Sequence, residues 1–268
     1  LYVVGLGPGH PDHLSARARE VLGRVEVVAG YTTYIDLIRP LLAHQHVIRT
    51  GMTREVDRVS AAIDEALAGR TCALVSSGDP GIYAMAGLVL ELCRARGLRL
   101  RRPGAPPDPE ALGIEIVPGI PALAAGAALL GAPLTHDFAA VSLSDLLTPW
   151  EVIEERLEAA ARADFVIVLY NPRSRRRQDQ LPRAREIVLR HRPPETPVGV
   201  VSAAMREDQE VHLTTLGELD PERVGMQTTV FIGSRSSFVY QGFMVTPRGY
   251  AGKYGAAFDP KAASTSEP

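Results

Sequence analysis

A glycine-rich turn near the start of the chain has the composition of an anion-binding loop. The sequence GLGPGH, residues 5–10, follows the apolar run at residues 1–4. After a strand, such a turn can hold a pyrophosphate on its backbone N–H groups. Pro8 removes one of these donors, however, and Ala29-Gly30-Tyr31 replaces the acidic residue that a dinucleotide-binding domain carries after its second strand. The turn therefore argues only weakly for a dinucleotide, and a tight turn beside another kind of cleft stays open.

A second stretch, SSGDPGIY at residues 76–83, follows the apolar run at 72–75. Gly78 lets the backbone approach a ligand closely, and Pro80 stiffens the turn. Asp79 has two open roles. It caps the following helix through backbone N–H groups, or it organises a loop whose main-chain groups bind an amino-acid-like ligand. Since a strand that ends at glycines before a helix is a common place for a small ligand, this stretch is the stronger of the two candidates.

A run of arginines follows an apolar strand in the second half of the chain. Its members are Arg173, Arg175, Arg176 and Arg177, with Arg183 and Arg185 further on. A solvated helix start capped by Ser174 explains any single one of them. Positive charge at a helix N-terminus is unfavourable against the helix macrodipole, however, so the cluster indicates an anionic partner. Arginine binds carboxylates through two parallel hydrogen bonds, which makes carboxylates the ligands that fit.

The elements that position these residues alternate between strand and helix, which predicts an α/β fold with largely parallel sheets. We expect strands at residues 1–4, 25–29, 72–75, 114–117, 140–143, 165–169, 198–201 and 229–232. We expect helices at residues 14–23, 34–42, 56–68, 84–96, 122–130, 149–163 and 181–190. The helix at 56–68 has an apolar stripe of Val56, Val59, Ile63 and Leu67, which we expect to face the core.

The domain organisation follows from the same pattern. We place the boundary near Pro118, which gives two α/β domains, residues 1–117 and 118–246, and an irregular tail at residues 247–268. The stretch 101–113 is dense in proline and glycine, so we expect an exposed loop there.

Composition narrows the function. The net charge of −2 argues against general nucleic-acid binding. The most apolar run, residues 120–134, is too short to span a bilayer and is broken by proline and glycine, so no membrane association is expected. The 7 histidines form no motif with cysteine and no HExxH helix, so no metal site is predicted. Cys72 and Cys93 are expected to be reduced core residues of a cytoplasmic protein.

Three motifs together resemble those of the tetrapyrrole methyltransferases of cobalamin and siroheme synthesis. They are GLGPG after the first strand, SSGDPGIYAMAG in the middle, and VPGIPALAAGAALLGAPLTHDF after a later strand. Their order and spacing match over about residues 1–245. Two further stretches, SLSDLLTPW at 142–150 and LYNPRSRRR at 169–177, most resemble the branch of the family that methylates C17 of precorrin-3B or cobalt-factor III.

The resemblance implies a homodimer of two-domain α/β chains, with S-adenosylmethionine in the cleft between the domains, S-adenosylhomocysteine as product and a tetrapyrrole as substrate. Carried over residue by residue, the cofactor contacts are Pro8, Ser77, Gly78, Asp79, Ile82, Tyr83, Pro121, Ala122, Asn171, Gly199, Thr228 and Thr229. The loop at 77–79 would contact the methionine part, and Thr228 or Thr229 would lie near the adenine. Pro121 departs from a commoner Ser or Thr and so lacks a side-chain hydroxyl, and the loop at 101–113 is longer than usual.

The resemblance also implies which steps need protein groups. A sulfonium methyl donor needs only an in-line approach to the ring carbon. Ring contraction, which accompanies C17 methylation in the resembled enzymes, needs proton transfer. The candidates are Asp145, His136 and Asp137, although Asp145 can instead cap a helix and His136 can fill a domain interface. The arginines expected to bind the acetate and propionate groups of the substrate are Arg173, Arg175 and Arg176.

Rival functions differ in what they need from the sequence. Methylation at another position of a precorrin or uroporphyrinogen stays within the same family. The diphthamide branch, with a protein substrate, is disfavoured by the motif at 142–150 and by the arginine cluster. A nucleotide-dependent oxidoreductase is disfavoured by the broken glycine pattern. A non-catalytic binding module would not need so many shaped loops at strand ends.

Overall fold

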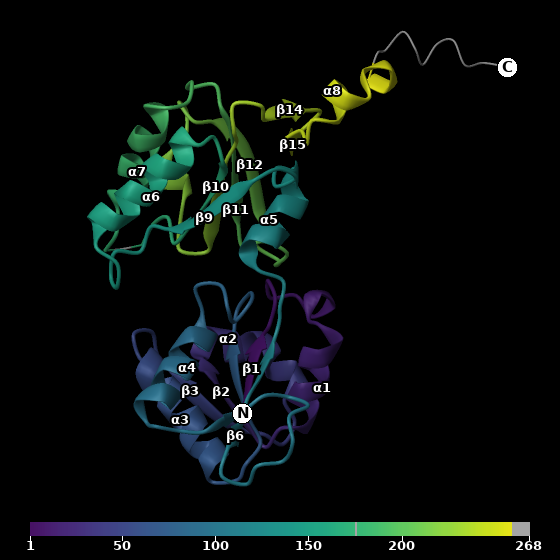
Figure 1. The fold of residues 1–268 in the computed structure, drawn as a ribbon, viewed down its shortest axis with the longest axis vertical. Coiled ribbons are helices and arrows are strands. Elements are labelled where there is room, and N and C mark those ends of the chain that lie inside the picture. The colour runs from purple at the N-terminus through teal and green to yellow at the C-terminus, as the bar shows by residue number, and fades with distance from the viewer. Residues whose placement is uncertain (175, 259–268) are drawn as a thin grey trace, which may run out of the picture. The chain divides into compact units, whose positions relative to one another are not determined.

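The computed structural model of the chain describes residues 1–174 and 176–258 (Figure 1). Contacts between residues divide the chain into two compact units. The first unit comprises residues 1–125 with 204–207, and the second comprises residues 126–203 with the described residues from 208 onward. The domain limit placed after residue 117 lies close to this division and stays a prediction.

The first unit is a parallel sheet with helices on both faces. Its strand order is β3-β2-β4-β1-β7, and every neighbouring pair in this order is parallel. The strands are β1 (Tyr2–Gly5), β2 (Val27–Tyr31), β3 (His46–Thr50), β4 (Cys72–Ser76) and β7 (Glu115–Val117). The helices are α1 (Ala16–Arg24), α2 (Thr32–Ile38), α3 (Glu55–Leu67) and α4 (Met85–Ala95).

Both faces of this sheet are buried, which explains why its central strands are continuous apolar runs. Val3 of β1 faces one hydrophobic cluster, to which α3 contributes Ile63. Val4, the next residue, faces the opposite cluster, to which α1 contributes Leu22. Successive residues of a strand point to opposite faces, so a sheet covered on both sides needs apolar residues at every position.

The buried face of α3 differs from the predicted apolar stripe. Val59 and Ile63 are buried as expected, but Val56 and Leu67 are 54% and 51% exposed. Arg58 is buried in their place, at 3% exposure. The hydrophobic pattern alone could not place Arg58 on the face of α3 that packs on the sheet. Whether a charged residue is buried depends on its hydrogen-bond partners in other elements.

The second unit contains a mixed sheet with the strand order β12-β11-β13-β10-β9. Its strands are β9 (Phe138–Ser142), β10 (Val166–Tyr170), β11 (Pro197–Ser202), β12 (Glu210–Thr215) and β13 (Thr228–Ile232). β9 and β10 pair in parallel, and the other neighbours pair antiparallel. The expectation of largely parallel sheets is therefore correct for the first unit and wrong for the second, where β13 runs against both of its neighbours.

Helices cover both faces of the second sheet as well. On one face, α6 (Trp150–Arg162) and α7 (Gln180–Leu189) pack on a cluster that includes Leu157 and Leu181. On the other face lies α5 (Ala122–Leu130), where Gly126 meets the ring of Phe231. A small sheet of β8 (Gly131–Ala132), β15 (Phe243–Val245) and β14 (Phe238–Tyr240) follows, and α8 (Tyr250–Lys253) comes after it.

The sequence predicted the buried elements and missed exposed ones. The predicted strands and helices agree with the structure to within a few residues, as expected for element ends. The edge strands β3 and β12 were not predicted, because none of their residues is fully buried and neither strand is a continuous apolar run. The stretch 101–113, expected to be a loop, is bounded by a pair of two-residue strands, β5 (Leu100–Arg101) and β6 (Leu112–Gly113).

The two cysteines are free and buried in the first unit. Burial raises the pKa of the Cys72 thiol to about 12, which leaves it protonated and unreactive at neutral pH. Across residues 1–174 and 176–258, no helix is both long enough and apolar enough to cross a membrane.

The close packing of α5 gives a test of the fold. A Cβ at Gly126 would lie 2.7 Å from two ring atoms of Phe231, whose fully buried ring has no room to move. Gly87 in α4 has nothing within 4 Å of such a Cβ. Because both changes add the same helix propensity, we expect the free energy of unfolding of Gly126→Ala to be lower than that of Gly87→Ala by about 1–3 kcal/mol in urea denaturation. Equal stability of the two variants would contradict this packing.

Candidate functional site

Three loops of the first unit meet at one edge of its sheet. β4, β1 and β7 are parallel neighbours, so their carboxyl ends lie side by side. The loops that follow them are residues 6–10, 77–84 and 118–121. The carboxyl edge of an open parallel sheet is where α/β proteins bind ligands. The motifs singled out in the sequence are therefore gathered at the edge where a ligand is expected.

The close approach of these loops leaves no room for a side chain at Gly5 or Gly119. The backbones of Gly7 and Gly78 exchange two hydrogen bonds, of 3.1 and 2.8 Å. Both residues have a left-handed backbone, with φ of 68° and 67°, which favours glycine. A Cβ at Gly5 would lie 2.6 Å from the Gly78 carbonyl oxygen and 2.7 Å from the Gly119 nitrogen. The glycines thus hold three loops in backbone contact.

The carboxylate of Asp79 ties two of these loops together. Oδ1 accepts a hydrogen bond from the backbone N–H of Gly81 at 2.8 Å, and Oδ2 accepts one from Gly119 at 3.1 Å. The helix α4 begins at Met85, and its N-terminal cap, Ala84, makes no side-chain cap bond. Asp79 therefore organises the loop rather than capping the helix. Its contact with a cofactor stays a prediction.

Pro8 and Ser77, on two of the loops, are bridged by an arginine from a distant part of the chain. Arg206 Nε donates to the Pro8 carbonyl oxygen at 2.5 Å, and Nη2 donates to Ser77 Oγ at 3.2 Å. Residues 204–207 belong to the first unit although they follow β11 in the chain. Arg206 was not predicted from the sequence, because no local motif marks a contact across 198 positions.

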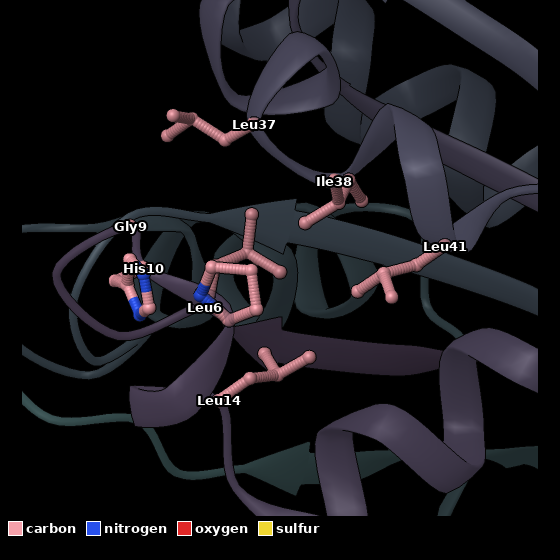
Figure 2. A pocket seen from close by; sticks show the side chains of 8 residues that line it. Leu6, Gly9, His10, Leu14, Leu37, Ile38 and Leu41 are labelled. Carbon is pink, nitrogen blue, oxygen red and sulfur yellow. The ribbon is translucent and has the colours of Figure 1, made fainter. Parts of the chain in front are cut away.

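A shallow apolar hollow lies beside the glycine turn (Figure 2). Its lining comes from the segment after β1 and from the α2 region: Leu6, Gly9, His10, Pro11, Leu14, Leu37, Ile38 and Leu41. Most of these residues are apolar, and His10 is the one titratable side chain among them.

The remaining predicted cofactor contacts of the first unit lie on the same loops. Pro121 ends the third loop and Ala122 begins α5, and a Cβ at Gly78 would lie 3.6 Å from Pro121 Cα. Ile82 donates its backbone N–H to the Asp79 carbonyl at 3.3 Å. Tyr83 has φ of 50° and is 54% exposed. All eight predicted residues of this unit therefore lie on the three loops or at the start of α5.

In the second unit, one edge of the sheet brings together another group of predicted residues. β13 is antiparallel to β10 and β11, so its first residue, Thr228, lies at their carboxyl ends. Thr228 Oγ1 and Ser202 Oγ are 2.7 Å apart. Asn171 follows β10 with φ of 50°, and its Nδ2 donates to Ser142 Oγ at 3.0 Å. Asn171, Thr228 and Thr229 therefore share this edge.

Gly199 lies within β11, away from this edge, and its contact is with α5. A Cβ there would overlap the side chain of Leu130, which is fully buried. The small size of Gly199 is therefore explained by packing, and its contact with a cofactor stays a prediction.

Asp145 lies near this edge with a half-buried arginine. Arg177 Nε donates to the Asn171 carbonyl oxygen at 3.0 Å, and Nη1 reaches Ser144 Oγ at 3.4 Å. Burial lowers the pKa of Arg177, and the Asp145 carboxylate opposes this shift. Asp145 Oδ2 accepts a hydrogen bond from Gln180 Nε2 at 2.7 Å, whereas α6 begins after Pro149 without a side-chain cap. The structure thus does not use Asp145 as a helix cap.

The predicted substrate arginines differ in how they are held. Arg173 donates to the Pro221 carbonyl oxygen at 2.7 Å and to Glu222 Oε1 at 2.6 Å, so its guanidinium is engaged within the unit. Arg176 is exposed and forms no ion pair with any residue that the structure describes. Arg175 lies outside the described residues.

His136 and Asp137 lie at the opposite end of β9 from Asp145. They precede Phe138, the first residue of β9, whereas Asp145 follows the strand. Five strand residues span about 16 Å. The Asp137 backbone N–H donates to His136 Nδ1 at 2.7 Å, and both side chains are exposed. The pair and Asp145 therefore cannot act on the same proton within this unit.

The arrangement of the glycine loops agrees with the result of a family comparison. The family model described as "Tetrapyrrole (Corrin/Porphyrin) Methylases" matches residues 1–220. The chain belongs to the tetrapyrrole methylase family. The family and the enzyme class predicted from the sequence, a tetrapyrrole methyltransferase, are thereby confirmed.

Individual relatives of this tetrapyrrole methylase match nearly all of its length. A protein of Salmonella typhimurium, "Probable cobalt-factor III C(17)-methyltransferase", is 48% identical over 93% of this chain and 99% of its own. A Sinorhizobium protein, "Precorrin-3B C(17)-methyltransferase", is 39% identical over 94% of this chain and 97% of its own. "Cobalt-factor III methyltransferase" of Priestia megaterium is 47% identical over 95% of this chain, which spans only 46% of that protein.

A solved structure confirms the fold of the tetrapyrrole methylase. The crystal structure of the methyltransferase CobJ superposes with a TM-score of 0.83 and 35% identity, covering 92% of this chain and 98% of that one. The predicted α/β fold class is therefore correct.

The role of Asp79 can be tested through stability. In Asp79→Asn, one of the two acceptor oxygens becomes an NH2 group that faces a backbone donor. We expect the free energy of unfolding to fall by about 1–3 kcal/mol in chemical denaturation. Asp57→Asn, which removes only an exposed ion pair with Arg54, is the matched control and should change stability by less than about 0.5 kcal/mol. Similar losses in both variants would argue against the role assigned to Asp79.

Proposed function

We propose that this tetrapyrrole methylase transfers a methyl group from S-adenosylmethionine to C17 of precorrin-3B or cobalt-factor III, with ring contraction, in cobalamin biosynthesis. The observation that carries the proposal is the 48% identity with the Salmonella relative over 99% of that protein's length. The Sinorhizobium relative, named for precorrin-3B, supports both substrates as candidates. Methylation at another position of a precorrin or uroporphyrinogen is the alternative, since solved uroporphyrin-III methyltransferases share the fold.

The first unit supplies the surroundings that the methionine part of the cofactor would need. The paired hydrogen bonds of Gly7 and Gly78 and the Gly119 bond to Asp79 fix the loop at 77–84 against its neighbours, so its main-chain groups would meet a ligand in a fixed geometry. We assign the contacts to Pro8, Ser77, Gly78, Asp79, Ile82, Tyr83, Pro121 and Ala122. Asn171, Gly199, Thr228 and Thr229 complete the proposed set from the second unit. The bound cofactor supplies an electrophilic methyl group.

The residues of the second unit are proposed to handle protons and substrate carboxylates. Asp145 is our candidate for proton transfer in ring contraction, because it lies near the edge that holds Asn171 and has a cationic neighbour in Arg177. Arg176 is the candidate for a substrate carboxylate, because it is exposed and has no ion-pair partner among the described residues. Arg173 would first have to leave Glu222.

We further propose that the enzyme acts as a cytoplasmic homodimer. An exposed aromatic face on the β14–β15 hairpin suits a protein partner. Tyr240 pairs with Phe243, so these side chains share one face of the hairpin with Phe238, and all three are between 46% and 62% exposed. Figure 1 shows the hairpin near the C-terminal end of the second unit, next to α8. Exposed aromatic residues that cluster in this way commonly mark interfaces.

The dimer proposal predicts a change in mass. We expect light scattering to give twice the chain mass for the natural sequence and a shift toward the monomer for Phe243→Asp, because a carboxylate in an apolar contact is costly. Val211→Asp, at a comparably exposed apolar position on β12, is the control and should keep the dimer. A dimer in both variants would place the interface elsewhere.

The cofactor class is tested by calorimetric titration. We expect S-adenosylhomocysteine to bind with micromolar affinity and NAD, titrated in parallel, not to bind. If S-adenosylhomocysteine binds, the protein is next incubated with S-adenosylmethionine and a corrin precursor. We then expect the mass of the corrin precursor to increase by one methyl group. No binding of S-adenosylhomocysteine, or binding of NAD instead, would overturn the proposed function.

A further inference from the structure

Arg58 of the first unit is buried without a carboxylate partner. The residue is 3% exposed. Its Nε donates to Thr50 Oγ1 at 2.6 Å, Nη2 donates to the Gly51 carbonyl oxygen at 3.1 Å, and Nη1 lies 3.8 Å from Met85 Sδ. In residues 1–174 and 176–258 no carboxylate forms an ion pair with it. Burial lowers the pKa of Arg58, against the influence of Glu55, Tyr34 and Tyr31.

A second buried arginine, Arg192, has a carboxylate near its guanidinium, which Arg58 lacks. Arg192, also 3% exposed, donates to the backbone carbonyls of Gly233 and Phe165, and Asp164 lies 3.7 Å from its Nε. Its charge is thus balanced inside the second unit. Arg58 has one hydroxyl, one carbonyl and one thioether, and a thioether is a weak acceptor. A buried guanidinium that lacks an anion is costly, so its retention calls for a ligand that supplies one.

The position of Arg58 relates it to the candidate site. Thr50 and Tyr31 end β3 and β2, at the edge where the glycine loops lie, and the Tyr31 ring centroid is 5.9 Å from the Arg58 guanidinium carbon. Met85 opens α4 directly after the loop at 77–84. Met85 is half-buried, so its flexible side chain contacts both the guanidinium and the surface. A carboxylate that displaced this side chain would reach Nη1.

We propose that Arg58, whose guanidinium Nη1 contacts Met85 Sδ, is a carboxylate-binding subsite of this enzyme. The subsite rests on the proposed function, because its ligand is a carboxylate either of the amino-acid part of the cofactor or of an acetate or propionate group of the tetrapyrrole. Replacement of the thioether contact by a charge-assisted hydrogen bond supplies the affinity. Arg58 would thereby discriminate carboxylated ligands from analogues that lack the group.

The test compares ligands with and without the carboxylate. Arg58→Met and Arg58→Lys are titrated with S-adenosylhomocysteine and with 5′-methylthioadenosine, which lacks the amino-acid part, and with uroporphyrin III as a polycarboxylate macrocycle. Arg54→Gln, an exposed arginine at the start of the same helix, is the control. The lysine variant keeps the charge if the methionine variant fails to fold.

We expect a loss of about 10- to 100-fold in one arm. Loss for S-adenosylhomocysteine with methylthioadenosine unchanged assigns the subsite to the cofactor, and loss for uroporphyrin III alone assigns it to the substrate. Equal loss for S-adenosylhomocysteine and methylthioadenosine overturns the subsite. No loss in either arm, while the natural sequence binds S-adenosylhomocysteine, overturns it too. Both results leave the proposed function standing. Failure of the natural sequence to bind S-adenosylhomocysteine overturns the proposed function and the subsite with it.

Discussion

The candidate site of the first unit depends on one constraint, the contact of three loop backbones with no side chain between them. Gly5, Gly78 and Gly119 come from the ends of three neighbouring strands, and a Cβ at Gly5 would lie within 2.8 Å of atoms from both other loops. The parallel order of the sheet places these strand ends together, and the hydrogen bonds of Asp79 fix their spacing. Gly78 is packed less tightly, since a Cβ there would lie 3.6 Å from Pro121 Cα, and its glycine is favoured by the φ of 67° instead.

The charged side chains at this edge of the first sheet differ in what neutralises them. The Asp79 carboxylate accepts hydrogen bonds from the backbone N–H groups of Gly81 and Gly119. Arg58 donates to Thr50 and Gly51, which are neutral acceptors, and no carboxylate of the described residues forms an ion pair with it. The edge therefore places one buried cation beside loops whose backbones are held in place, which is the arrangement on which the proposed carboxylate subsite rests.

The sequence was most informative where a local rule decides the structure. A left-handed backbone position favours glycine locally, so the loops at Gly7 and Gly78 were predicted. A strand that is covered on both faces requires a continuous apolar run, so the central strands were predicted as well. Arg58 and Arg206 were not, because the first is buried by partners from other elements and the second acts across most of the chain. The edge strands β3 and β12 lacked an apolar pattern, and the antiparallel course of β13 leaves no mark on its own sequence. Asp145 and His136 were both candidates for proton transfer from the sequence, and only the structure shows that they lie at opposite ends of β9.

The return of residues 204–207 to the first unit has a consequence for how the protein forms during synthesis. The strands of the first sheet lie within the first 117 residues, so that sheet can assemble early. Arg206, which bridges Pro8 and Ser77, leaves the ribosome only after β11 has been made, because 198 positions separate it from Pro8. Contacts of such long sequence separation are slow to form. The loops at residues 6–10 and 77–84 therefore reach their final geometry only after β11 of the second unit has been translated, so the proposed cofactor site would form late although its own sheet forms early.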